Sequence, residues 1–188
     1  MKKILFIFVL FFVFSLHATV VTAYLIDFEN MPDLTSVGDY YASYGLHFQN
    51  AISLTAGFSL NEIDYPPSSG LVAIGDDFAP IEIVFDSPSA NISAYFTYGS
   101  QLTFTAYDSS GTLLGQYLHA SLSNLGSTEL IPLNFTNVNK LVIAGQWDGS
   151  YIMDDLSFAP IPEPASVILL AISCLSGAGY LRKRVIKS

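Results

Sequence analysis

The chain has 188 residues, of which 51% are hydrophobic and only 12% are charged. Residues 24–160 contain fifteen acidic residues and one basic residue, Lys140, so this central segment has a formal charge of −14. A body with that charge repels phosphate backbones, which argues against a nucleic-acid partner, and it is long enough for one domain with a core of its own.

The first 23 residues have the pattern of a secretory signal peptide. Two lysines follow the initial methionine, and residues 4–16 are apolar apart from one serine. This run is too short to span a membrane but suits the core of a signal peptide. Small residues allow cleavage before Tyr24, with cleavage after Ala18 or an uncleaved anchor as alternatives. The pattern predicts export.

Short runs of β-prone residues recur between turn residues along residues 24–160, without a sustained apolar period of 3.6 residues. Many short strands without helices predict an all-β fold, a single antiparallel β-sandwich of jelly-roll type. The strands are expected at residues 24–29, 45–50, 71–74, 81–85, 90–98, 101–107, 112–117, 129–134, 140–144 and 151–158.

Turn residues predict how several of these strands connect. The segment 86–89 contains a proline between serines and is expected to form a turn. The pair Gly99-Ser100 suits a tight hairpin, and segment 108–111 ends in a glycine that tolerates positive φ. Each of the three is therefore expected to reverse the chain.

Alternation of side chains predicts which face of a strand is buried. In the strand 101–107 one face carries Leu102, Phe104 and Ala106. In the strand 151–158 the same parity places four residues on one face: Ile152, Asp154, Leu156 and Phe158.

The segment 81–115 resembles the jelly-roll sandwiches of galactose-binding-like domains and carbohydrate-binding modules. The resemblance lies in Ile-Glu-Ile-Val-Phe, in Tyr95-Phe96 and in Thr-Ala-Tyr-Asp-Ser-Ser-Gly-Thr-Leu-Leu, while residues 152–158 are similar to the closing strand of such modules. Because one fold serves many functions, the resemblance does not by itself establish sugar binding.

A structural calcium is the cofactor that this resemblance implies. Jelly-roll modules often bind calcium through acidic residues of the first and last strands, and the matching positions are Asp27, Glu29 and Asp154. Calcium takes six to eight oxygen ligands, so backbone carbonyls and water would complete the site. The alternative is that these carboxylates face solvent at strand ends.

Aromatic residues in predicted loops are the candidates for glycan binding. Tyr40, Tyr41 and Tyr44 cluster before a strand, and Trp147 lies in a loop before the last strand. Sugar rings stack on exposed aromatic faces, and binding sites of this kind are concave or built from loops. Alternatively, Tyr40 and Tyr44, four residues apart, close the core as a local helical turn.

The sequence offers no set of catalytic residues. The predicted mature domain has two histidines, His47 and His119, and no cysteine. His47 alternates with apolar neighbours and is expected to point outward. No nucleophile elbow, zinc-protease motif or phosphate-binding loop occurs. We therefore expect a protein that is not an enzyme, although a carboxylate pair for glycoside cleavage stays an alternative.

The C-terminal residues 161–188 resemble a PEP-CTERM sorting domain. Its three parts occur in order: the motif Pro162, Glu163 and Pro164; an uncharged stretch over residues 165–181; and the basic tail Arg182, Lys183 and Arg184. The stretch is just long enough for a transmembrane helix, and its basic tail is expected to stay cytoplasmic. The resemblance implies processing by an exosortase-type enzyme after anchoring in the inner membrane.

Together these features predict an exported, non-enzymatic protein of the cell surface or extracellular matrix. The alternative is a carbohydrate-binding module that acts on exopolysaccharide, and a glycan-processing enzyme is a third reading.

Overall fold

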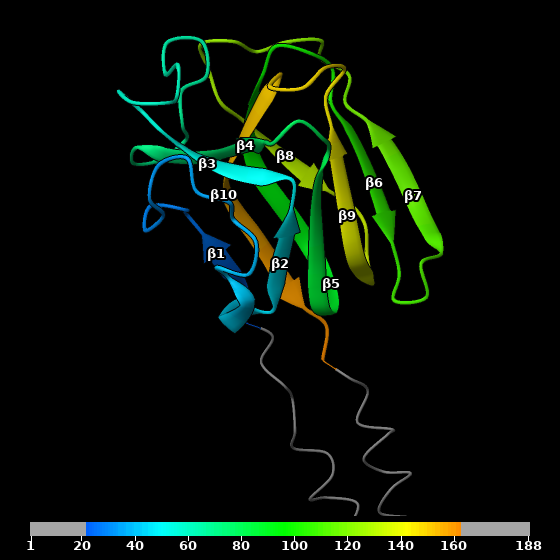
Figure 1. Cartoon of the computed structure of the whole chain (residues 1–188). Coiled ribbons are helices and arrows are strands. Elements are labelled where there is room, and N and C mark those ends of the chain that lie inside the picture. The colour runs from blue at the N-terminus through cyan, green and yellow to red at the C-terminus, as the bar shows by residue number, and fades with distance from the viewer. Residues whose placement is uncertain (1–21, 163–188) are drawn as a thin grey trace, which may run out of the picture.

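The computed structural model describes residues 22–162, which form an all-β structure with one short 3-10 helix, η1 (Ala42–Tyr44) (Figure 1). The all-β prediction is confirmed. Most of the predicted signal peptide and everything after Pro162 lie outside the described residues. Within them, no helix is long and apolar enough to cross a membrane. The strands are β1 (Tyr24–Ile26), β2 (Leu46–Gln49), β3 (Ala51–Thr55), β4 (Val72–Asp76), β5 (Ile81–Tyr98), β6 (Thr103–Tyr107), β7 (Leu113–Leu118), β8 (Glu129–Leu133), β9 (Val138–Ala144) and β10 (Tyr151–Pro160).

All ten strands belong to one antiparallel sheet, in the order β3-β4-β10-β5-β9-β6-β7, with β1 added to β10 and both β2 and β8 added to β5. The long strand β5 joins two halves of this sheet. Its first residues pair with β2 and β9, whereas its residues 89–98 pair with β10, and β8 pairs with residues 92–96.

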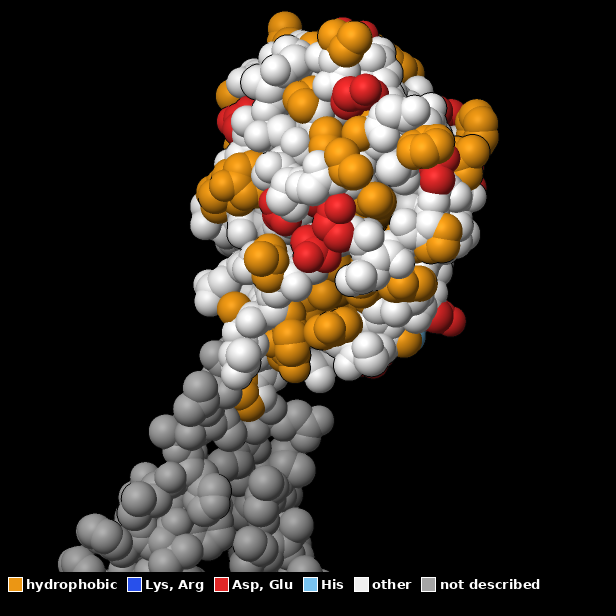
Figure 2. Space-filling model, turned by 90° about the vertical axis from the view of Figure 1, so that its left-hand side faces the viewer, with side chains coloured by type: hydrophobic (Ala, Val, Ile, Leu, Met, Phe, Trp, Pro, Cys, Tyr) orange, Lys and Arg blue, Asp and Glu red, His pale blue; other side chains and the backbone are white. Residues whose placement is uncertain are grey.

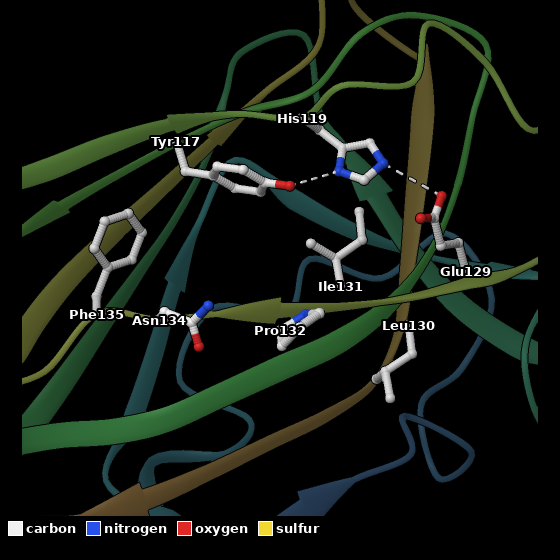
Figure 3. Close-up of a pocket in the computed structure, with 8 residues that line it drawn as sticks. All are labelled: Tyr117, His119, Glu129, Leu130, Ile131, Pro132, Asn134 and Phe135. Carbon is white, nitrogen blue, oxygen red and sulfur yellow. Dashed lines mark hydrogen bonds and ion pairs between the residues drawn. The ribbon is translucent and has the colours of Figure 1, made fainter.

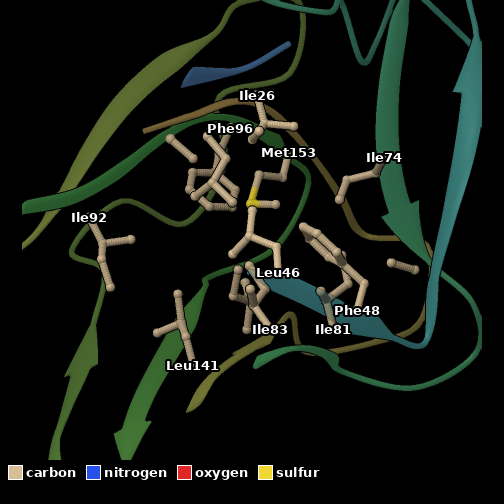
Figure 4. Packing of buried hydrophobic residues seen from close by; sticks show 14 of the residues in the cluster. Ile26, Leu46, Phe48, Ile74, Ile81, Ile83, Ile92, Phe96, Leu141 and Met153 are labelled. Atoms are coloured by element: carbon tan, nitrogen blue, oxygen red, sulfur yellow. The ribbon is translucent and has the colours of Figure 1, made fainter. Parts of the chain in front are cut away.

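The two halves of the sheet face each other across one core. Phe96 of β5 and Phe104 of β6 lie in different halves, and their ring centroids are 5.3 Å apart. Phe85 and Phe158 make a similar contact at 5.4 Å. Figure 4 shows the packing of this core, to which both halves contribute buried residues. The molecule is thus a β-sandwich, as predicted, but its two layers are continuous through β5.

A smaller apolar cluster covers the outer face of β10. Leu60 packs there with Ala73 and Ile152, and the segment 56–71 lies over them. Two carboxylates hold this segment in place. Asp154 Oδ2 accepts hydrogen bonds from Ser68 N and Ser69 N, at 2.8 and 2.9 Å. Glu29 accepts hydrogen bonds from the backbone N–H groups of residues 71 and 72.

Two of the three predicted turns are wrong. The segment 86–89 is not a chain reversal, since β5 runs through it with a register shift where the strand crosses between layers. Gly99-Ser100 does not form a hairpin, because β6 pairs with β7 and β9 and not with β5. The strand β3 lies directly after β2, where the sequence predicted no strand.

The third predicted turn is confirmed as the β6–β7 hairpin. Asp108 Oδ1 accepts hydrogen bonds from Ser110 Oγ at 2.7 Å, Thr112 N at 2.8 Å and Ser110 N at 2.9 Å, which lower the pKa of this carboxyl group. Gly111 has φ 79°, the left-handed conformation that glycine adopts without a steric cost.

The predicted parity holds in β6 and fails in β10. Leu102, Phe104 and Ala106 are all fully buried. In β10 the register shifts between Asp154 and Ser157, with Asp155 at φ 49°. This β-bulge reverses the alternation. Asp154 therefore lies on the outer face of the layer with Ile152, whereas Met153, Leu156 and Phe158 belong to the main core.

The surface of the described domain is acidic. Lys140 is its single lysine or arginine, and its Nζ lies 3.5 Å from Glu82 Oε2 and 5.0 Å from the ring centroid of Tyr107. On the face shown in Figure 2 the charged side chains in view are Asp and Glu.

Candidate functional site

The candidate site is a groove between two edge strands, β7 of one layer and β8 of the other. In the described sheet β7 pairs only with β6, and β8 pairs only with β5. Two adjoining pockets of about 320 and 370 Å³ make up the groove, and they share Pro132, Asn134 and Phe135. The first pocket lies between β7 and β8, and the second continues along β8 beside β5. Figure 3 shows the first pocket, with β8 on one side and the end of β7 on the other. Its other lining residues are Tyr117, His119, Glu129, Leu130 and Ile131.

Two aromatic rings contribute to the groove. Tyr117 lies opposite Phe104 in the β6–β7 ladder, and the two rings stack with centroids 5.9 Å apart. Phe135 lies against β7 at Gly115, where an added Cβ would come within 3.1 Å of its ring. The glycine thus provides the space in which this ring lies.

A chain of polar contacts crosses the end of the first pocket. Tyr117 Oη lies 3.1 Å from His119 Nδ1, and His119 Nε2 lies 3.3 Å from Glu129 Oε2. Tyr98 Oη donates a hydrogen bond of 2.6 Å to the same carboxylate oxygen. Burial, and secondarily this hydrogen bond, raises the pKa of Tyr98 to about 12, so the phenol keeps its proton and acts as a donor at neutral pH.

The second pocket extends the groove beyond Phe135. Asn91, Ser93 and Thr136 line it together with residues shared with the first pocket. Amide and hydroxyl groups both donate and accept hydrogen bonds. The groove thus combines apolar ring faces with uncharged polar groups, which suits a ligand with hydroxyl groups and weakly polar faces.

The groove does not contain the charged pair that glycoside hydrolysis requires. Most glycosidases use two carboxyl groups on either side of the scissile bond. Among the residues that line the two pockets, Glu129 is the only carboxylate, and Tyr98 and His119 already contact it.

The structure does not assemble the three predicted calcium ligands into a metal site. The carboxylates of Glu29 and Asp154 accept hydrogen bonds from backbone N–H groups of the segment 68–72, and Asp27 is exposed. Between residues 22 and 162 no group of three or more His, Cys, Asp or Glu side chains is placed to hold a metal ion. Because N–H donors occupy the carboxylates, the set does not fit calcium as it stands, and calcium binding stays a prediction.

The predicted glycan-binding aromatics do not meet at one site. Tyr44 packs edge-on against Tyr24, which pairs with Phe158 near the end of β10. Trp147 precedes the start of β10, so about 23 Å of strand separates the two regions. Tyr40 and Tyr44 are exposed, which contradicts their interpretation as core residues. Tyr41 is the ring that closes the core, and it packs edge-on against Phe28 and Phe48.

His47 points outward, as predicted, and bridges two carboxylates. Its Nδ1 lies 2.7 Å from Asp39 Oδ1 and its Nε2 lies 3.1 Å from Asp86 Oδ1. The hydrogen bond to Asp39, with a smaller one to Asp86, raises the pKa of this imidazole. The cluster lies outside both pockets and ties the segment before β2 to β5.

Sequence reasoning missed most residues of the groove. Tyr117, Glu129 and Phe135 belong to separate predicted strands or follow one, and nothing in their local sequence links them. His119 offered the only usable signal in the sequence, because it is one of two histidines in the central segment. The structure buries it beside the carboxylate of Glu129.

Comparison with known proteins yields fold likenesses alone. No protein-family model and no curated protein matches the chain. Among solved structures, a K1 cleaved adhesin domain of Lys-gingipain from Porphyromonas gingivalis W83 shares 12% identity at a TM-score of 0.44, over 75% of this chain and 99% of that one.

Carbohydrate-binding modules are also among these structures. A CBM22-1 xylan-binding domain from Paenibacillus barcinonensis has 12% identity and a TM-score of 0.43, over 78% of this chain and 99% of its own. A module of Cellvibrio mixtus lichenase 5A solved with cellotriose has 11% identity and a TM-score of 0.35, over 62% and 91%.

Proposed function

We propose that residues 24–160 form a non-enzymatic carbohydrate-binding domain, and that the groove between β7 and β8 holds a segment of a polysaccharide. The observation that carries this proposal is the run of two adjoining pockets along β8, with aromatic rings and neutral polar groups in their walls. Ligand sites in proteins combine such apolar walls with a few placed polar groups.

The shape of the groove supports an extended ligand. The two pockets adjoin along β8 and share Pro132, Asn134 and Phe135, so a ligand long enough to fill both would extend from Glu129 to the amide and hydroxyl groups of the second pocket. Pro132 also removes one N–H group from β8, which makes this edge strand a poorer template for a further strand. A polysaccharide could contact both pockets in succession.

We further propose that the domain is exported, anchored briefly in the inner membrane and delivered to the cell surface or extracellular matrix by a PEP-CTERM-type signal. The support is the sequence of residues 1–23 and 161–188, together with one feature of the fold. Tyr24 pairs with Phe158, so both ends of the domain leave it on the same side (Figure 1). This arrangement suits a precursor whose two apolar ends meet one membrane.

Glycan binding is tested with residues 24–160, since this segment contains every described strand and the main core. We expect binding to at least one soluble polysaccharide in affinity electrophoresis. The Tyr117→Ala variant should weaken it about fivefold, because an aromatic contact contributes about 1 kcal/mol. Tyr44→Ala is the matched control, since Tyr44 is 46% exposed and Tyr117 is 39% exposed.

A larger loss in Tyr44→Ala than in Tyr117→Ala would place the site at the tyrosine cluster and refute the groove. No binding across a broad glycan panel would leave a structural surface or matrix protein without a glycan ligand. Thermal unfolding of both variants checks that each keeps its fold.

The sorting proposal has its own test in a Gram-negative host with an exosortase. Simultaneous replacement of Pro162, Glu163 and Pro164 by alanine should leave export intact but block C-terminal processing. The motif interrupts helical structure just before the apolar stretch, where a membrane protease could meet an extended chain. Intact mass reports the processing, and an unchanged processed mass in the variant would contradict the proposal.

A further inference from the structure

We infer that the glycan held by the groove carries free amino groups, and that an ammonium group of the sugar binds to Glu129. The inference rests on the proposed carbohydrate-binding function and adds the chemical class of the ligand. Two observations carry it: the charges around the groove, and the oxygen of Glu129 that has no partner among the described residues.

The charges exclude an acidic polysaccharide. The residues that line the two pockets include no lysine or arginine. The single lysine or arginine of the described domain, Lys140, contacts Glu82 and Tyr107 and does not line either pocket. A uronate, phosphate or sulfate group would therefore enter a negative field without a partner. The acceptable ligands are neutral or cationic.

Glu129 has an oxygen left for a ligand. Oε2 takes both contacts that the described residues make with this carboxylate, from Tyr98 Oη and His119 Nε2. The side chain is 40% exposed and lines the first pocket. The described residues provide no lysine or arginine to pair with this carboxylate.

Tyr117 lies beyond His119, with the centroids of these two rings 6.0 Å apart, and offers its ring to a neighbouring part of the sugar chain. Its ring lines the same pocket and is linked to Glu129 through His119 (Figure 3). Ammonium groups are attracted both to aromatic faces and to carboxylates, and a hydrogen bond to a charged group is stronger than one between neutral groups. A sugar amine can pair its charge with the carboxylate of Glu129, whereas an acetylated amine offers neither a charge nor a compact donor.

The test compares two ligands that differ only at the nitrogen. Oligomers of glucosamine and of N-acetylglucosamine, of equal length, are titrated into residues 24–160 by calorimetry at physiological ionic strength and a pH that keeps the amines protonated. We expect the glucosamine oligomer to bind at least about tenfold more tightly. Glu129→Gln should remove this preference, since glutamine retains an acceptor for Tyr98 but has no charge.

The control for general attraction between an acidic protein and a cationic sugar is Asp77→Asn. Asp77 is exposed in the β4–β5 connection, three strands away from β8 in the sheet, and its replacement removes the same charge. It should leave the preference unchanged. Leu130→Lys is a second groove variant that spares the buried contacts, because Leu130 is 49% exposed. It should weaken only the glucosamine oligomer.

Equal binding of the two oligomers would overturn the inference and leave the proposed function standing. The same holds if Asp77→Asn lowers the preference as much as Glu129→Gln does, because the attraction would then come from the whole domain. If neither oligomer binds but a neutral glycan of another kind does, the ligand class is wrong. Failure of every glycan in the panel would overturn the carbohydrate-binding function itself.

Discussion

The domain is expected to lose stability as the pH rises from about 4 to about 7, because of Asp154. Burial raises the pKa of this carboxyl group from 3.8 to about 7, and the proximity of Asp155 adds to the rise. The N–H groups of Ser68, Ser69 and Asp155 oppose the rise only in part.

The sign follows from proton binding. Between these two pKa values the folded chain holds a proton that the unfolded chain has released, so the free energy of unfolding falls with increasing pH. A difference of about three pKa units corresponds to as much as about 4 kcal/mol. This contribution is fully present below pH 4 and is lost by pH 7.

Urea unfolding at several pH values between 4 and 7.5 measures this effect, with Asp154→Asn as the comparison. The variant cannot ionise at this position, so its free energy of unfolding should change much less over the interval. Some dependence should persist, because the pKa values of Asp76 and His47 are also raised. Identical slopes for the two proteins would show that Asp154 does not titrate in this range.

Local sequence was enough to predict most strands of the fold. The alternation in β6 predicted its buried face correctly, because the ladder there is regular over residues 103–106. In β10 the same argument failed after Asp154, since one bulge at Asp155 moves every later side chain to the other face. The bulge coincides with the hydrogen bond from Ser69 Oγ to Asp155, and Ser69 is distant in sequence. The alternation of apolar and polar residues within β10 does not indicate this contact.

The groove was harder to predict than the strands for a related reason. Glu129 lies in the site because β8 pairs with the second half of β5. Tyr117 lies there because β7 pairs with β6. Those pairings place the two strands on different layers, and the layers depend on β5 continuing through residues 86–89. A turn predicted at residues 86–89 divides β5 into two separate strands. The arrangement of layers that forms the groove does not follow from such a prediction. The signal-peptide pattern of residues 1–23 and the sorting-signal pattern of residues 161–188, by contrast, are local, so the sequence alone is enough to predict them.

The Gly70→Ala variant is expected to destabilise the domain by about 3 kcal/mol, because Gly70 lies against the carboxyl group of Glu29. A Cβ at this position would overlap that group, and the backbone has φ 47°. The left-handed conformation costs an L-residue about 1 kcal/mol. Moving Glu29 away also removes the acceptor of the Val72 N–H group, which is buried, and an unpaired buried donor costs about 1–3 kcal/mol.

Gly57→Ala separates the backbone cost from the loss of the Glu29 contact. Gly57 lies in the same segment with φ 78°, but an added Cβ would meet nothing within 4 Å. Its free energy of unfolding should therefore fall by only about 1 kcal/mol. In a Glu29→Ala background the two glycine variants should become similar, because the obstructing carboxyl group is gone. Equal losses for Gly70→Ala and Gly57→Ala in the wild-type background would mean that Glu29 does not hold the segment over the outer face of β10.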